Sequence, residues 1–331
     1  MGADVLTRKV VILGTGSTIG TLTRVAFATE LGVRGFVRRL TRKMPKWRSE
    51  YCHLAHAIDA CGFEDLDQIW THVDYAGKLH RSLSLERSPY HGDTSGQLHR
   101  ALLVAYSLTD ELEKLDLDSS FTLKTALMQL GDGDVLISFN WDTTAERIAD
   151  KLGKKLLATG PGLSRHSVNL VKPHGSLSWE DGGKPERTIW RHDDGKPLLD
   201  PMDVNCVHPC PGKPMQPLVL GAVPMKERLI QETQKGNPKI YEIFADQWAA
   251  VVRAITEARA LTVIGYRFPS EDGYGRFLLR EAARRRDRPL PEIPYYALEQ
   301  DKAEIELALR EIFGGVQCDF KGPVSPASPK P

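Results

Sequence analysis

Apolar, β-branched runs recur along the chain and are separated by polar and glycine-containing segments. Six runs are candidate strands: KVVILG (9–14), DVLISFN (134–140), VNLVK (168–172), PLVLG (217–221), ALTVIG (260–265) and PYYALE (294–299). Near-continuous apolar strands are typical of a parallel sheet that is covered on both faces. Helical patterns separate several of them, at 143–152, 240–259, 272–286 and 301–313. This alternation predicts a doubly wound, mostly parallel α/β sheet.

The long region between the first two candidate strands has a different pattern. Residues 34–130 read mainly as helices, because segments such as EDLDQIWTHVDYAGKLH carry apolar residues three and four apart. We interpret 34–130 as a helical insertion into a Rossmann-like domain formed by 1–33 and 131–320. Within that domain, 159–216 is rich in Gly, Pro and charge and is expected to form a small loop-rich module. Residues 321–331 are rich in Pro and Ser and are expected to be a disordered tail.

Charge and overall hydrophobicity favour a small-molecule ligand. Lys and Arg number 44 against 43 acidic residues, so the net charge of +1 gives no general reason to expect nucleic acid or an anionic membrane as partner. No apolar run approaches the roughly 20 residues that a transmembrane helix needs, and MGADVLTRK lacks the apolar region of a signal peptide. We therefore expect a cytoplasmic protein. The basic stretch 34–48 is typical of a solvated helix face, with a partner protein, nucleic acid or cofactor phosphates as alternatives.

The five cysteines are an odd, scattered set, which argues against a disulfide framework. CVHPC (206–210) offers half of a zinc site, but no second closely spaced cysteine pair completes it. We read this segment as a Pro-rich loop and expect no metal.

Four polar motifs follow the carboxyl ends of candidate strands: GTGST after 13, FNWD after 138, KPHGS after 171 and GYRFPSED after 264. In open parallel sheets ligands bind at that edge. The sequence therefore predicts a ligand site where these motifs meet.

The first motif has the composition of a phosphate-binding turn. Gly14 and Gly16 permit a tight turn and close approach to a pyrophosphate, whose charge the amides of the following helix stabilise. Gly20 comes one residue late for the GxGxxG spacing, so a plain strand-to-helix turn is the alternative. A further alternative is an NADP-dependent reductase, in which Arg38 and Arg39 would bind the phosphate on the adenosine ribose. The chain has no Tyr-x-x-x-Lys pair, which argues against one large reductase class.

The second and third motifs carry the candidate catalytic groups. Asn140 and Asp142 are two apart on an extended segment and so project to the same side, toward a ligand crevice. Alternatively, Asp142 or Thr143 caps the helix TTAERIAD. His174 follows a strand and precedes a glycine, and an imidazole that titrates near neutral pH can polarise a sugar hydroxyl or a water.

Together the four motifs resemble those of sirtuin-like NAD-consuming proteins, most of all the bacterial sirtuin-like NAD hydrolases of antiphage defence. The resemblance spans about 10 to 300. GTGST resembles the sirtuin Gly-Ala-Gly-x-Ser loop, SFNWD the Thr-Gln-Asn-Ile-Asp motif, KPHGSLSW the catalytic-histidine block, and GYRFPSED the late Gly-Tyr-Ser-Leu-Pro stretch. The resemblance implies that Asn140, His174 and Asp142 are catalytic. The residues it implies for NAD binding are Gly14, Thr15, Gly16, Ser17, Thr18, Gly265, Tyr266 and Asp272.

The chain also departs from the deacetylating sirtuins. It has TIGTLTRVAF in place of their Gly-Ile-Pro-Asp-Phe-Arg loop, only CVHPC in place of two zinc-binding cysteine pairs, and Arg267 in place of the late motif's Ser. The departures favour NAD hydrolysis over protein deacetylation.

The resemblance further implies a mechanism and partners. Asn140 would position the ribose and the attacking water, His174 would act as general base, and Asp142 would orient the nicotinamide side or the Asn loop. NAD would be the substrate, with nicotinamide and ADP-ribose as products. A homo-oligomer or a regulatory partner, such as an ATPase or an Argonaute-type protein, would hold the enzyme inactive until infection, so nucleic acid would act only indirectly. Two other functions stay open: a non-catalytic module that senses NAD or ADP-ribose, and an NADP-dependent oxidoreductase.

Overall fold

The computed structural model describes part of the chain: residues 8–14, 17, 33–62, 69, 73, 94–106, 121–158, 162–180, 217–219, 238–270 and 272–324. Several predictions fall on other residues. They concern Thr15, Gly16, Thr18, the CVHPC segment and most of the loop-rich module, and they lie outside the described residues.

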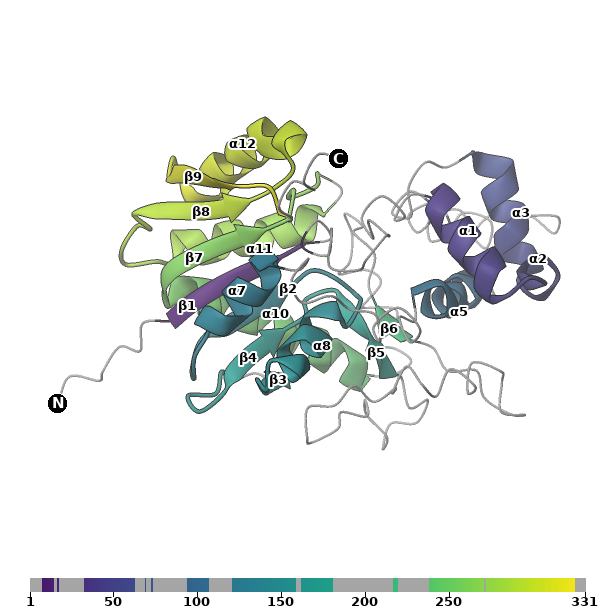
Figure 1. The fold of residues 1–331 in the computed structure, drawn as a ribbon, viewed down its shortest axis with the longest axis horizontal. Coiled ribbons are helices and arrows are strands. Elements are labelled where there is room, and N and C mark those ends of the chain that lie inside the picture. Colours follow the sequence, from purple (N-terminus) through teal and green to yellow (C-terminus); the bar gives the residue numbers. More distant parts are fainter. Residues whose placement is uncertain are drawn as a thin grey trace.

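Seven parallel strands form the central sheet, in the order β3-β4-β2-β1-β7-β8-β9 (Figure 1). β1 lies between β2 and β7, and the chain continues to β2, β3 and β4 on one side before it crosses to β7, β8 and β9 on the other. This arrangement confirms the doubly wound parallel prediction. The strands are β1 (Arg8–Leu13), β2 (Val135–Ser138), β3 (Leu156–Ala158), β4 (Val168–Val171), β7 (Ala258–Ile264), β8 (Glu292–Tyr296) and β9 (Gln317–Gly322).

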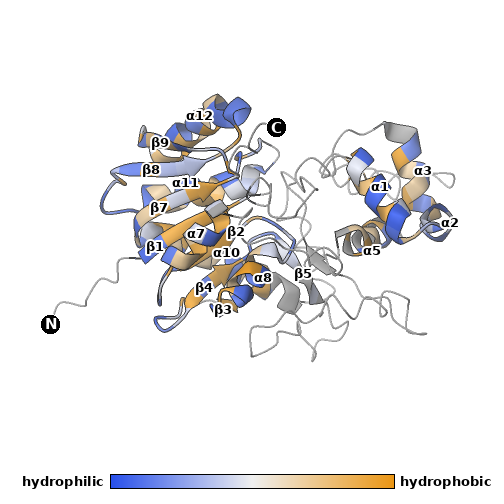
Figure 2. Cartoon of the chain, in the orientation of Figure 1, coloured by the Kyte–Doolittle hydropathy of each residue, from blue (hydrophilic) through white to orange (hydrophobic). Residues whose placement is uncertain are grey.

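Helices cover both faces of this sheet because consecutive residues of the central strands are apolar and buried. Figure 2 shows apolar colouring in the interior of the sheet. Val11 and Leu13 of β1 belong to a core cluster with α7 (Phe121–Gln129) and α8 (Thr144–Lys151). Val10 and Ile12 belong to the opposite cluster, with α10 (Pro238–Thr256), α11 (Gly273–Arg284) and α12 (Lys302–Phe313). Among the described residues, no helix is both long enough and apolar enough to cross a membrane.

The described residues between β1 and β2 are mainly helical, in agreement with the apolar spacing of this region. They include α1 (Val33–Lys43), α2 (Trp47–Glu50), α3 (Cys52–Cys61) and α5 (Thr94–Tyr106), which gather beside the sheet in Figure 1. α7 comes from the same region but lies beside α8 against the sheet. On α1, Arg34, Arg38 and Arg42 are exposed four residues apart, as expected for a solvated face, whereas Arg39 is buried.

Three details differ from the sequence prediction. β6 (Pro217–Val219), predicted as a strand of the parallel sheet, instead pairs antiparallel with β5 (Gly175–Glu180) in a separate two-stranded sheet. β3 and β9 add two edge strands to the central sheet that were not predicted. Residues 321 and 322 belong to β9 and Val324 is buried, so the predicted disorder is wrong for 321–324. Residues 325–331 lie outside the described part.

Candidate functional site

The candidate site lies at the carboxyl ends of β1, β2, β4 and β7, around the point where the strand order reverses. β2 and β7 flank β1 on either side (Figure 1), with Leu13 in register with Ser138 and with Ile264. Ligands of open parallel sheets bind at such a switch point. Hydrogen bonds, an ion pair and ring contacts join residues of the four polar motifs at this point.

Gly14 brings the ends of β1 and β7 together. Its amide donates to the Ile264 carbonyl over 3.0 Å. A Cβ at this position would lie 2.5 Å from the Tyr266 Cα and 2.6 Å from the Gly265 carbonyl oxygen, so a larger residue does not fit without a backbone shift. The Ser17 amide donates to the Gly14 carbonyl over 2.8 Å and forms a turn. Strand packing thus accounts for Gly14, and pyrophosphate binding by the 14–18 loop stays a prediction.

Asn140 is held against this turn by its side-chain amide. Nδ2 donates to the Gly14 carbonyl over 3.1 Å and to Ser17 Oγ over 3.2 Å, and only 4% of the residue is exposed. The Phe139 amide donates to the Leu13 carbonyl over 2.9 Å, which fixes the adjacent backbone. Oδ1 of Asn140 is buried and has no hydrogen-bond partner among the described residues. Because an unsatisfied buried acceptor costs about 1–3 kcal/mol, Oδ1 marks a place for a ligand's donor group.

His174 pairs with Asp272 across two strand ends. Nε2 of His174 lies 2.9 Å from Oδ2 of Asp272, and their side chains are 7% and 0% exposed. The Tyr266 hydroxyl donates to the same Oδ2 over 2.8 Å, and the Gly275 amide donates to Oδ1 over 3.0 Å as Asp272 caps α11. These donors compensate for burial of the carboxylate. The structure shows a contact of the Asp272 carboxylate with His174, and cofactor binding by Asp272 stays a prediction.

Aromatic rings pack around His174, and one of them belongs to Phe139, the residue before Asn140. The ring of Phe139, the residue before Asn140, meets the His174 ring edge-on with centroids 5.0 Å apart. The same Phe139 ring stacks on Tyr266 at 4.3 Å with an interplanar angle of 8°. The FNWD, KPHGS and GYRFPSED motifs therefore share one packed aromatic cluster, which fixes the orientation of the imidazole.

Asp142, and not Thr143, caps helix α8 with its side chain. Its Oδ1 accepts from the Thr144 amide over 2.8 Å at the start of α8, whereas Thr143 makes no side-chain capping bond. Asp142 is 6% exposed. Its capping role is thus established by geometry, and a catalytic role stays a prediction.

Lys172 is a residue of the site that the sequence analysis missed. Its side chain is 1% exposed, and Nζ donates to the Asp142 carbonyl over 2.6 Å, to Glu146 Oε1 over 2.9 Å and to Ser176 Oγ over 3.0 Å. Lys172 therefore ties the FNWD turn to the segment that carries His174. Lysine side chains are usually exposed to solvent. Lys172, however, directly follows an apolar run and begins the KPHGS motif, and this position in the sequence could have indicated that it is buried at the site.

The late motif is buried at its start and exposed at its third residue. Gly265 has φ of 62°, and its amide donates to the Tyr296 carbonyl over 2.8 Å. Tyr266 is buried with its hydroxyl on Asp272, while Arg267 is exposed. NAD contacts by Gly265 and Tyr266 therefore stay predictions.

These groups are of the kinds that acid–base chemistry uses. Asn140 presents a fixed, buried acceptor, and an imidazole oriented by a carboxylate is the usual arrangement of a general base. Within the described residues, no group of three or more His, Cys, Asp or Glu side chains is placed to hold a metal. Comparison of the chain with protein-family models and with curated proteins finds no match.

Proposed function

We propose that this protein is an NAD hydrolase of sirtuin-like type, which cleaves NAD to nicotinamide and ADP-ribose. The observation that carries the proposal is the buried Oδ1 of Asn140, which has no partner among the described residues, at the end of β2, with a histidine paired to Asp272 at the end of the neighbouring strand β4. The contact between the rings of Phe139, the residue before Asn140, and His174 supports the proposal that both strand ends serve one ligand.

The unpaired acceptor supports a ligand with hydroxyl donors. Two contacts from Nδ2 fix the orientation of the Asn140 amide, and Oδ1, with no partner among the described residues, can accept from an incoming group. Ribose hydroxyls and water are such donors, and the carboxyl edge of a doubly wound sheet is where nucleotides bind. In the proposal the nicotinamide ribose and the attacking water lie at Asn140, and the pyrophosphate lies on the 14–18 loop.

The proposed reaction breaks the bond between C1′ of the ribose and the nicotinamide nitrogen. The bond's electron pair stays with nicotinamide, which leaves uncharged, and a water oxygen adds to C1′. In the proposal Asp272 orients the imidazole of His174 through Nε2, and the neutral ring takes the proton of that water. A positioned general base of this kind contributes typically about 10²–10⁴-fold to the rate.

The family resemblance supplies the biological part of the proposal. The hydrolase would act in the cytoplasm as an NAD-depleting effector of antiphage defence. A homo-oligomer or a regulatory partner, such as an ATPase or an Argonaute-type protein, would control it.

Chromatography of NAD incubated with concentrated protein tests the reaction class. We expect nicotinamide and ADP-ribose in equal amounts, with NADP run in parallel to establish cofactor preference. NAD that binds but stays intact would instead support a sensing module. Conversion to the reduced cofactor, with its nicotinamide bond intact, would support an oxidoreductase.

A further inference from the structure

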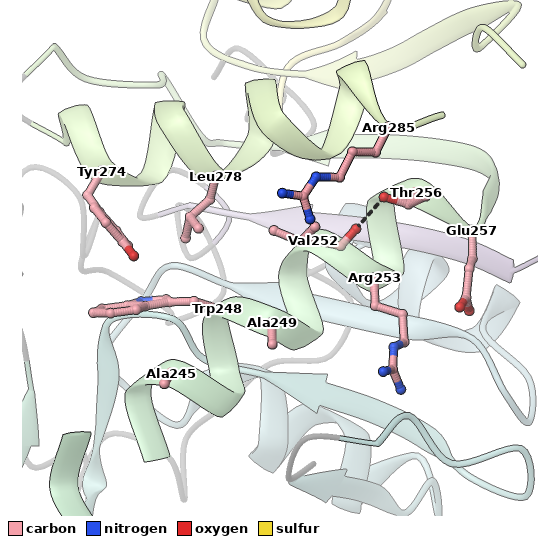
Figure 3. Close-up of a pocket in the computed structure, with 10 residues that line it drawn as sticks. All are labelled: Ala245, Trp248, Ala249, Val252, Arg253, Thr256, Glu257, Tyr274, Leu278 and Arg285. Atoms are coloured by element: carbon pink, nitrogen blue, oxygen red, sulfur yellow. Dashed lines mark hydrogen bonds between the residues drawn. The ribbon is translucent and has the colours of Figure 1, made fainter. Parts of the chain in front are cut away.

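A groove between α10 and α11 lies apart from the residues of the switch-point site. It encloses about 550 Å³, within the range of roughly 300–1,000 Å³ typical of small-molecule sites. Figure 3 shows aromatic side chains at one end and charged side chains at the other.

The aromatic end is formed in advance of any ligand. The rings of Trp248 and Tyr274 lie with centroids 4.4 Å apart, tilted by 56°. Nε1 of Trp248 donates to the Pro173 carbonyl over 3.0 Å, which holds the indole in place. Val252 and Leu278 add apolar wall, and Ala249 leaves room between the helices (Figure 3). Such a preformed apolar surface binds a ligand with little loss of side-chain entropy.

The charged end has an excess of positive charge. Arg253 and Arg285 are both exposed, and Arg253 has no ion-pair partner among the described residues. Arg285 makes only a 3.9 Å contact with Glu281. The one acid that lines the groove, Glu257, is neutralised by Arg8 at 2.9 Å. The groove is thus complementary to an anion.

We propose that this groove binds a small amphipathic anion, an aromatic or branched apolar body that carries a carboxylate, sulfonate or phosphate. The apolar body lies at the end lined by Trp248 and Tyr274, and the anionic group lies at the opposite end, which Arg253 and Arg285 make positive. The proposal does not depend on the reaction at the switch point.

Two fluorescent probes that differ in charge test it. 8-Anilinonaphthalene-1-sulfonate has an aromatic body and a sulfonate, and N-phenyl-1-naphthylamine is its uncharged counterpart. We expect saturable binding of both at one site per chain. Because Arg253→Gln with Arg285→Gln removes both positive charges that line the groove, the double variant should weaken sulfonate binding at least about tenfold and leave the uncharged probe nearly unaffected.

Two further variants control the experiment. Arg280→Gln removes an exposed arginine of α11 that does not line the groove, and it should leave both probes unaffected. Ala249→Trp fills the groove from an exposed helical position and should abolish binding of both probes, with circular dichroism showing an intact fold. Sulfonate affinity that is unchanged in the double arginine variant, or reduced equally by Arg280→Gln, would overturn the proposal. So would an oligomeric wild type that Ala249→Trp converts to a monomer, because a second copy would then cover the groove.

Discussion

Replacing Asp272 by Asn keeps the shape of the side chain and inverts one of its hydrogen-bonding roles. If the amide oxygen keeps the capping bond from the Gly275 amide, the new NH₂ group faces the Tyr266 hydroxyl and Nε2 of His174. Nε2 can then only accept, so the imidazole proton moves to Nδ1. The donor and acceptor nitrogens of the ring would exchange, and the imidazole would lose the carboxylate that orients it as the proposed base.

The size of the effect follows from the contacts. Three hydrogen bonds to a carboxylate become neutral bonds, and each change costs about 1 kcal/mol, so we expect a loss of about 3 kcal/mol in the free energy of unfolding. The rate of NAD cleavage should fall by about 10²–10⁴-fold, the usual contribution of a general base. The decrease in rate should thus far exceed what the small loss of folded protein explains.

Nitrogen-15 NMR of the histidine side chains reports the tautomer of His174, urea titration reports stability, and nicotinamide release reports the rate. Asp301→Asn is the matched control, because Asp301 also precedes a helix but makes no side-chain capping bond. The control should change none of the three. An Asp272→Asn variant with an unchanged tautomer and an unchanged rate would refute the assignment of Asp272 as the residue that positions His174.

Three other predictions concern stability. Gly14→Ala would place a Cβ 2.5 Å from the Tyr266 Cα, so urea titration should show a loss of about 1–3 kcal/mol. Gly273→Ala, with no atom within 4 Å, should be neutral or gain up to about 1 kcal/mol, and equal effects at both sites would contradict the close approach. Lys172→Met should cost about 3–5 kcal/mol because it leaves Glu146 unpaired, and adding Glu146→Gln should recover part of it; a negligible loss would contradict the buried pair. Burial of the Tyr295 hydroxyl, followed by its hydrogen bond to Glu306, raises the pKa of Tyr295 in the folded protein. The unfolded chain therefore loses this proton at a lower pH than the folded protein does, and the free energy of unfolding falls above about pH 10. Tyr295→Phe should make that fall shallower in urea titrations across this pH range, and equal slopes would contradict it.

Hydrophobic patterning predicted the interior of the sheet and failed at its edges. β1, β2, β4, β7 and β8 are apolar runs that the sequence reveals directly, since central parallel strands are buried on both faces. β3 has three residues, and β9, QCDFKG, is half polar, so neither produces such a run. β6 is apolar but short, and nothing in three residues tells which sheet it joins.

The candidate site was predictable in its position more than in its contacts. Asn140 and His174 were predicted because parallel strands bring their carboxyl ends to one edge. Asp272 has the local signature of a helix cap, and its pairing with a histidine 98 residues earlier depends on the order of strands in the sheet. Lys172 was missed because single-residue preferences place lysine in solvent, and only tertiary packing supplies its three partners.

The rate of nicotinamide release from NAD by the wild type, Asn140→Ala and His174→Ala tests the central claim most directly. His166→Ala, which removes an exposed histidine near His174 in the sequence, serves as the matched control. We predict release by the wild type and by His166→Ala, and a fall of at least about 10²-fold in each of the other two variants while they stay folded. No release by the wild type, or a wild-type rate in Asn140→Ala or His174→Ala, would contradict the account.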